Sequence, residues 1–136
     1  MKLVKFVACI LVALCSSTPY AQIPKAQYSD EIPYISGGIG SGESEAIEGQ
    51  AKQWPLMLQF SQIDAKGWGS WISGVKVRIL SNQKNEIFSC TCEGPLLLID
   101  LKSGEYMVEA SYSGVSQQKT LLVKKGQPEK VSIYWK

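Results

Sequence analysis

Apolar and polar residues alternate with a period of two through most of the chain after residue 55. Between residues 106 and 112 the even positions are aromatic or aliphatic, and residues 56–60 and 75–79 show the same alternation. Such a period predicts strands with one buried and one solvated face. The two apolar runs between Pro95 and Gly114, joined at Gly104, predict a β-hairpin.

Seven strands are expected in residues 55–136, starting near residues 56, 75, 86, 96, 106, 118 and 130. The segments between them are rich in Gly, Asn, Asp, Ser and Pro, which favour tight turns. These segments are too short for helices, so an α/β fold is excluded. We therefore predict a mainly β protein that folds as a seven-stranded, Ig-like sandwich of two sheets.

The segment before the predicted sandwich divides into two parts. Residues 22–42 contain prolines and end in a glycine cluster, without sustained periodicity, so we expect an extended arm. The glycines do not follow a predicted strand, as those of a nucleotide-binding loop would, and favour a hinge or a close backbone approach. Residues 43–54 are predicted to form one short helix that ends before Pro55.

Residues 1–21 have the layout of a secretory signal peptide, with Lys2 and Lys5 before a short apolar run and a small, polar end at Ala21. That run is too short to span a membrane, and no later segment is long and apolar enough. We expect an exported protein, periplasmic or extracellular after cleavage at Ala21, with a cut near Ser17 as the alternative.

The charges are nearly balanced, with 14 basic and 12 acidic residues and scattered lysines. Neither a nucleic acid nor an anionic membrane surface is therefore an expected partner. The absence of histidine from the sequence excludes His-dependent triads, His-based zinc centres and imidazole proton relays. Asp100, Glu105 and Glu109 are acid–base candidates by residue type alone, and solvated charges are the favoured interpretation. We predict no enzymatic activity, no metal and no cofactor.

Cys90 and Cys92 are two residues apart, so they face the same side of one predicted strand. Two strand residues span roughly 6.6 Å, near the upper limit of the Cα separation in a disulfide. Three interpretations remain open: two buried or half-buried thiols, a strained disulfide, and a soft-metal site completed by other ligands. Lipid attachment at Cys15 is less favoured, because Leu14 is bulkier than the small residue expected before such a cysteine.

Trp68 and Trp71 lie in a glycine-bearing segment before the strand that starts near residue 75. Two large rings in such a loop can stack on a sugar or anchor a partner protein. Alternatively, one ring closes the end of the sandwich, as we expect for Trp54 and Trp135.

Two segments, residues 74–79 and residues 94–110 followed by Gly114 and a further strand, resemble the carboxypeptidase regulatory-like domains. Those domains have a prealbumin-like (transthyretin-like) β-sandwich, and they are accessory modules, so the resemblance implies no peptidase activity. Its strongest element is Leu101-x-x-Gly104-x-Tyr106, which implies a structural turn with Gly104 left-handed and Tyr106 returning to the core. The segment from Tyr34 to Gly40 is similar to the opening of small exported proteobacterial proteins that carry this domain.

The sequence thus favours a non-enzymatic exported binding or assembly module that contacts an envelope protein or a glycan through Trp68 and Trp71. The alternative is a small envelope enzyme, or a soft-metal or redox protein, that uses Cys90, Cys92 and surface carboxylates. A third possibility is a structural subunit that self-associates through an exposed edge strand.

Overall fold

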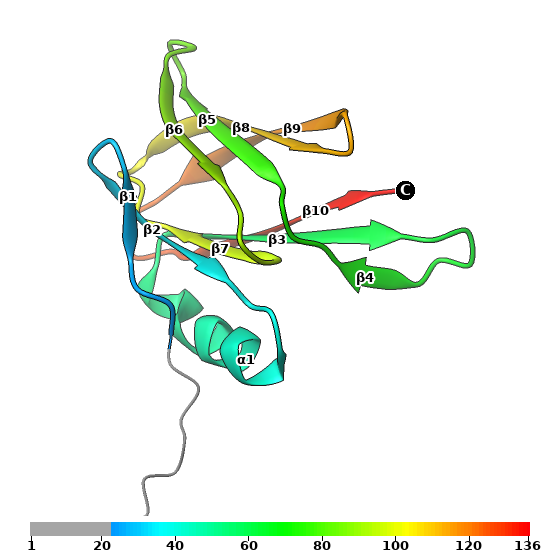
Figure 1. Cartoon of the computed structure of the whole chain (residues 1–136). Helices are drawn as coiled ribbons and strands as arrows, with labels where there is room; N and C mark the ends of the chain where they lie inside the picture. The colour runs from blue at the N-terminus through cyan, green and yellow to red at the C-terminus, as the bar shows by residue number, and fades with distance from the viewer. Residues whose placement is uncertain (1–22) are drawn as a thin grey trace, which may run out of the picture.

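The computed structural model describes residues 23–136, so the predicted signal peptide lies outside the described residues. Two β-sheets pack face to face, and a single helix covers the outer face of one of them (Figure 1). In chain order the elements are β1 (Gln27–Ser29), β2 (Ile32–Gly37), α1 (Ser41–Gln50), the 3-10 turn η1 (Ala51–Gln53), β3 (Leu56–Ile63), β4 (Gly69–Trp71), β5 (Lys76–Ser81), β6 (Glu86–Thr91), β7 (Leu96–Ile99), β8 (Gly104–Tyr112), β9 (Val115–Val123) and β10 (Glu129–Trp135).

The first sheet has the strand order β1-β2-β7-β3-β10, with β4 paired to the far end of β3, and the second has the order β6-β5-β8-β9. Neighbouring strands are antiparallel except β3 and β10, which are parallel. The prediction of a mainly β protein with two packed sheets is confirmed. The seven strands predicted for residues 55–136 are one too few, because this range contains eight, and residues 23–136 contain ten.

Two of the additional strands, β1 and β2, lie in the segment expected to be an extended arm. β2 is an interior strand that pairs with β1 on one side and with β7 on the other, where Tyr34 is opposite Ile99 and Gly37 is opposite Leu96. Pro33 and the terminal glycine conceal this strand in the sequence, since both residue types are depleted in strands. The segment forms a strand because it pairs with the apolar strand β7, although its own residues have a low strand propensity.

The helix α1 carries the chain from β2 to β3 and packs on the outer face of the first sheet (Figure 1). Ile47 is fully buried there against residues of all three strands beneath it: Ile35, Met57, Leu96 and Leu98. The other residues of β7, Leu97 and Ile99, face the second sheet. Because β7 is buried on both faces, its four residues are all apolar and do not alternate with polar ones.

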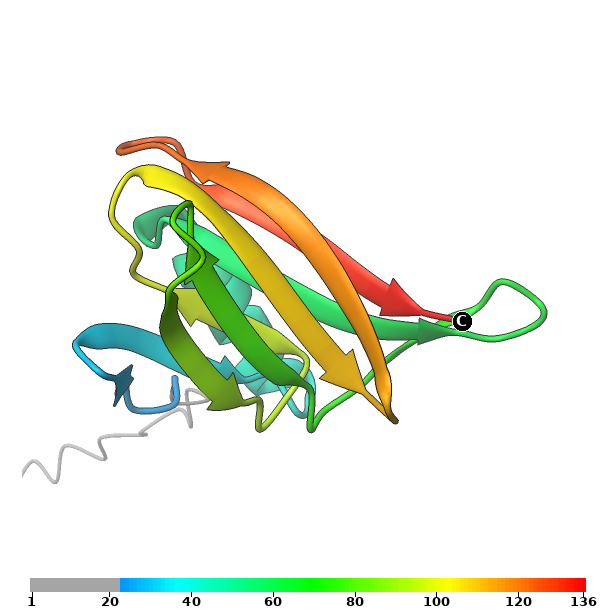
Figure 2. The same ribbon diagram turned by 90° about the horizontal axis from the view of Figure 1, so that it is seen from above.

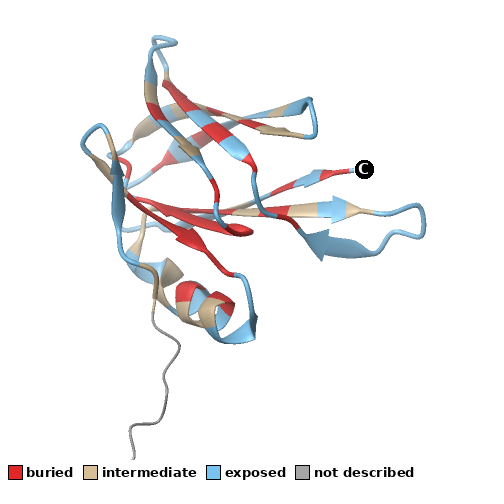
Figure 3. Ribbon diagram, viewed as in Figure 1, coloured by how far each residue is buried: buried red, intermediate tan, exposed pale blue. Residues whose placement is uncertain are grey.

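The main core lies between the two sheets, where Figure 3 shows buried residues on both facing layers. Side chains also bridge the open sides of the sandwich. On one side, Ser29 Oγ accepts a hydrogen bond from the backbone N–H of Ser89 at 3.0 Å. On the other, Lys119 Nζ donates to the carbonyl of Ser132 at 3.0 Å. These contacts satisfy backbone groups that edge strands would otherwise leave unpaired. None of the helical segments in residues 23–136 has the length and apolarity required to cross a membrane.

Candidate functional site

A hairpin formed by β3 and β4 projects from one end of the sandwich (Figures 1 and 2). The first half of β3 pairs with β7, whereas Ser61, Gln62 and Ile63 pair with β4. All three residues of β4 are exposed, as is the loop that precedes it (Figure 3). The hairpin thus presents its side chains to the surroundings and not to the core.

Trp68 lies at the end of this hairpin and Trp71 where β4 returns to the sandwich, and 72% and 45% of their surfaces are exposed. Neither ring closes the end of the sandwich, so that alternative is wrong for both residues. Trp135 is buried in the main core, whereas Trp54 is half-buried against the helix-covered outer face of the first sheet, so the expectation that it closes the end of the sandwich is wrong. Two large exposed rings on one projecting hairpin mark a candidate contact site.

The loop before Trp68 is held in one conformation by Asp64. Its carboxylate Oδ1 accepts hydrogen bonds from the backbone N–H groups of Lys66 at 2.9 Å and Trp68 at 3.0 Å. The backbone N–H of Asp64 donates to the carbonyl of Trp68 at 2.9 Å, and Gly67 takes a φ of 84°. The hairpin loop therefore has three residues, and the last of them, Gly67, is left-handed, as is typical of such loops. The backbone at Trp68 is therefore held in one conformation.

Cys90 lies in β6 and Cys92 directly after its end, and the two thiols interact, which agrees with the predicted shared side. Cys90 pairs with Val77 of β5, and the N–H of Cys92 donates to the carbonyl of Val75 at 2.8 Å. Both are free thiols in the structure; Cys92 is buried in the main core and Cys90 is half-buried beside it. This arrangement agrees with the first of the three interpretations, a pair of buried or half-buried thiols.

The surroundings of Cys92 favour its protonated form. Its interaction with Cys90 and its burial raise the pKa of the Cys92 thiol well above the ordinary value. The same cluster includes Tyr34, whose pKa is raised by burial and by the neighbouring Cys90. Since a thiolate is the nucleophile and the metal ligand, Cys92 is poorly prepared for either role.

The hairpin predicted between Pro95 and Gly114 is wrong, because β7 belongs to the first sheet and β8 to the second, so the two strands do not pair. The predicted turn at Gly104 and Tyr106 is present in a different form. Gly104 is not among the residues with positive φ; it starts β8 and pairs with Val123, so the expected left-handed conformation is wrong. Tyr106 is half-buried against the main core, and its hydroxyl donates a hydrogen bond of 2.7 Å to the carbonyl of Lys102. The tyrosine hydroxyl, and not a glycine conformation, fixes the β7–β8 loop.

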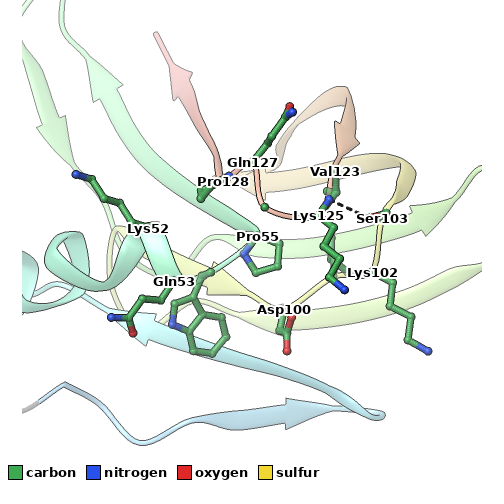
Figure 4. Close-up of a pocket in the computed structure, with 13 residues that line it drawn as sticks. Lys52, Gln53, Pro55, Asp100, Lys102, Ser103, Val123, Lys125, Gln127 and Pro128 are labelled. Carbon is green, nitrogen blue, oxygen red and sulfur yellow. Dashed lines mark hydrogen bonds between the residues drawn. The ribbon is translucent and has the colours of Figure 1, made fainter.

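A pocket of about 400 Å³ lies at the start of β3, at the opposite end of this strand from the tryptophans (Figure 4). Three connections meet there: the junction between η1 and β3, the β7–β8 loop and the β9–β10 loop. Its apolar lining residues are Trp54, Pro55, Leu101, Val123 and Pro128, and its charged lining residues are Lys52, Asp100, Lys102 and Lys125. This pocket could not be predicted from the sequence, because nothing in the chain order indicates that these connections meet.

The acid–base candidates are not gathered at one place. Asp100 lines the pocket, whereas Glu105 and Glu109 lie on the solvated face of β8, about 13 Å apart along the strand. Glu109 forms an ion pair with Arg78 at 3.3 Å. Within the described residues, no three Cys, Asp or Glu side chains cluster in a way that could hold a metal ion.

No family model matches this chain, and a search of curated proteins finds no similar sequence.

Proposed function

We propose that this protein is a non-enzymatic binding module that docks the β3–β4 hairpin into an apolar cleft of an envelope protein. The observation that carries the proposal is the exposure of Trp68 and Trp71 on a hairpin that projects beyond the sandwich. Tryptophan dominates the hot spots of protein interfaces, because it buries a large rigid surface at a low entropic cost.

The fixed loop supports this function. Two backbone N–H groups on the Asp64 carboxylate hold the loop before binding, so less conformational entropy is lost on docking. The exposed parts of the two side chains can together bury roughly 200–300 Å², about a third of what one partner contributes to a standard interface. The hairpin is therefore expected to act as the central anchor of a larger contact.

A protein partner is favoured over a glycan by the shape and polarity of the hairpin. A sugar site needs polar groups around the aromatic platform to bind hydroxyls. At the loop, Oδ1 of the Asp64 carboxylate already accepts two backbone hydrogen bonds. A projecting hairpin that carries an exposed ring at its tip is complementary to a cleft.

The test uses the purified secreted protein and a partner isolated from envelope extract. We expect Trp68→Ala and Trp71→Ala each to weaken partner binding about 30-fold, the effect of losing a hot-spot residue. Tyr28→Ala is the matched control, since Tyr28 is 68% exposed on β1, away from the hairpin. Unchanged affinity in the Trp68/Trp71 double variant would contradict the proposal. If the protein binds a glycan in a Trp68-dependent way and binds no protein, the partner is a glycan and the proposed protein partner is wrong.

We also infer export and a prealbumin-like sandwich of the carboxypeptidase regulatory-like kind. Export is supported by the layout of residues 1–21, and sequencing the mature N-terminus tests it, with Gln22 expected first. The prealbumin-like fold is supported by residues 74–136, which form β5 to β10 across both sheets. Superposition of a crystal structure on such a domain tests it.

The alternative function, a small envelope enzyme or a redox protein, has less support. Cys92 is buried and its pKa is raised, which keeps its thiol protonated at neutral pH. A reactive thiol in the native protein, measured by titration with a thiol reagent at pH 7, would favour that alternative.

A further inference from the structure

The pocket at the start of β3 has an excess of positive charge in a chain whose charges are otherwise nearly balanced. Lys52, Lys102 and Lys125 line it, and Asp100 is its one acidic lining residue. Among the described residues, both ion pairs belong to Arg78, so these lysines have no carboxylate partner. Figure 4 shows the side chain of Lys125 extending toward Asp100, while Lys52 and Lys102 point outward on opposite sides.

The floor of the pocket is apolar and closed. Leu101 and Val123 are 4% and 2% exposed, and Pro55, Pro128 and the half-buried Trp54 complete the lining. A volume of about 400 Å³ lies at the small end of the range for small-molecule sites and is sufficient for a single sugar ring. A proline and tryptophan surface accommodates the apolar face of such a ring.

Hydrogen bonds hold all three connections around the pocket in place. The hydroxyl of Tyr106 donates to the carbonyl of Lys102 at 2.7 Å, which fixes the β7–β8 loop. The N–H of Lys125 donates to Ser103 Oγ at 3.0 Å and joins the β9–β10 loop to it. The N–H of Glu129 donates to the carbonyl of Pro55 at 2.9 Å, and this hydrogen bond joins the end of the β9–β10 loop to the start of β3. The pocket is thus formed before any ligand enters.

We propose that this pocket is a second binding site, independent of the tryptophan hairpin, and that it takes a sugar acid: a hydroxylated ring that carries one carboxylate. The ammonium group of Lys125 binds the ligand carboxylate, and the exposed side chain of Lys102 reaches the same carboxylate by rotating inward. The Asp100 carboxylate accepts a hydrogen bond from a ring hydroxyl, and the apolar floor packs against the ring carbons. Asp100 also disfavours a dianion, since its own charge repels a second negative group.

The test is an NMR titration of the ¹⁵N-labelled secreted protein at low ionic strength, with D-glucuronate as the probe. D-glucose is the neutral control with the same ring, and inorganic phosphate is the anion without a ring. We expect glucuronate to shift the indole signal of Trp54 and the amide of Gly126, and to leave the indole of Trp68 unchanged. Glucose and phosphate are expected to bind at least tenfold more weakly.

Substitutions separate this site from the hairpin. Lys125→Gln and Lys102→Gln should each weaken glucuronate binding about five- to tenfold, and added salt should weaken it further. Lys84→Gln, in the β5–β6 turn, is the matched control and should have no effect. The Trp68/Trp71 double variant should bind glucuronate normally, so failure of the hairpin proposal leaves this one standing.

Two results would overturn the proposal. One is the absence of glucuronate-dependent shifts at Trp54 and Gly126 in a folded protein. The other is equal binding of phosphate and glucuronate, because the pocket would then recognise charge without a ring.

Discussion

The indole N–H of Trp135 donates a hydrogen bond of 2.9 Å to the backbone carbonyl of Val115, and it joins the edge strands of the two sheets. Trp135 ends β10 in the first sheet, and Val115 begins β9 in the second. The same ring packs against Phe60 and Tyr112, with ring centroids 6.4 Å and 5.7 Å apart. One side chain therefore fills the core and also satisfies the exposed edge of a neighbouring sheet.

Trp135→Phe should lower the free energy of unfolding by about 1–3 kcal/mol, because the Val115 carbonyl loses its partner and the core loses volume. Urea unfolding followed by far-UV circular dichroism measures this loss. Lys119→Met is the control at the same pair of edges, and it should cost less than about 1 kcal/mol because Lys119 is exposed. Equal effects of the two substitutions would contradict the role given to Trp135.

Gly94 and Gly49 should respond to alanine in opposite directions. A methyl group at Gly94 would overlap the carbonyl group of Gly37 in β2. Because these are backbone atoms, they cannot move aside as a flexible side chain would. Gly94→Ala should therefore destabilise the fold by about 1–3 kcal/mol. Gly49 lies in α1 with open space around it, so Gly49→Ala should stabilise by about 0.5–1 kcal/mol. Thermal unfolding of both variants tests the pair, and a stable Gly94→Ala variant would exclude the close approach.

Stability should fall as the pH rises above about 9. The folded state raises the pKa of Cys92 above its ordinary value of 9.0, so at high pH only the unfolded chain loses this proton. The contribution is fully present below the unfolded pKa, and the slope approaches about 1.4 kcal/mol per pH unit above it. Unfolding by urea between pH 7 and 10 measures the slope. Cys92→Ala should remove most of it, and a slope that persists in this variant would assign it to other groups.

Asp64→Ala should loosen the hairpin loop without unfolding the protein. The backbone N–H groups of Lys66 and Trp68 lose their shared acceptor, so their hydrogen exchange should accelerate. Because the loop is exposed, the free energy of unfolding should change by less than about 1 kcal/mol. Asp64→Asn is the matched control, since its amide oxygen can accept the same bonds. Unchanged exchange in Asp64→Ala would show that the turn forms without this side chain.

The strands that alternate clearly could be predicted from the sequence, because their period follows directly from burial of one face. Val108 and Ala110, for example, are fully buried while Glu109 is on the solvated face of β8. β2 could not be predicted, since Pro33 and its terminal glycine give a weak local signal. Its position depends on pairing with β7, about 60 residues later in the chain.

The candidate sites divide in the same way. Trp68 and Trp71 stood out because large apolar rings beside glycines are conspicuous in any sequence, although their exposure needed the structure. The pocket around Lys125 gave no signal, because its residues come from three turns that are unremarkable one by one.

The sequence by itself determined the β class, the strands with alternating faces, the shared face of Cys90 and Cys92, and the exclusion of histidine chemistry. These follow from residue type and from the fixed geometry of an extended chain. Only the tertiary structure decided that β2 is an interior strand, that the tryptophan hairpin projects from the sandwich, and that three turns enclose a lysine-lined pocket. These depend on which distant segments pair, and the free energy of that pairing is shared among residues far apart in the chain.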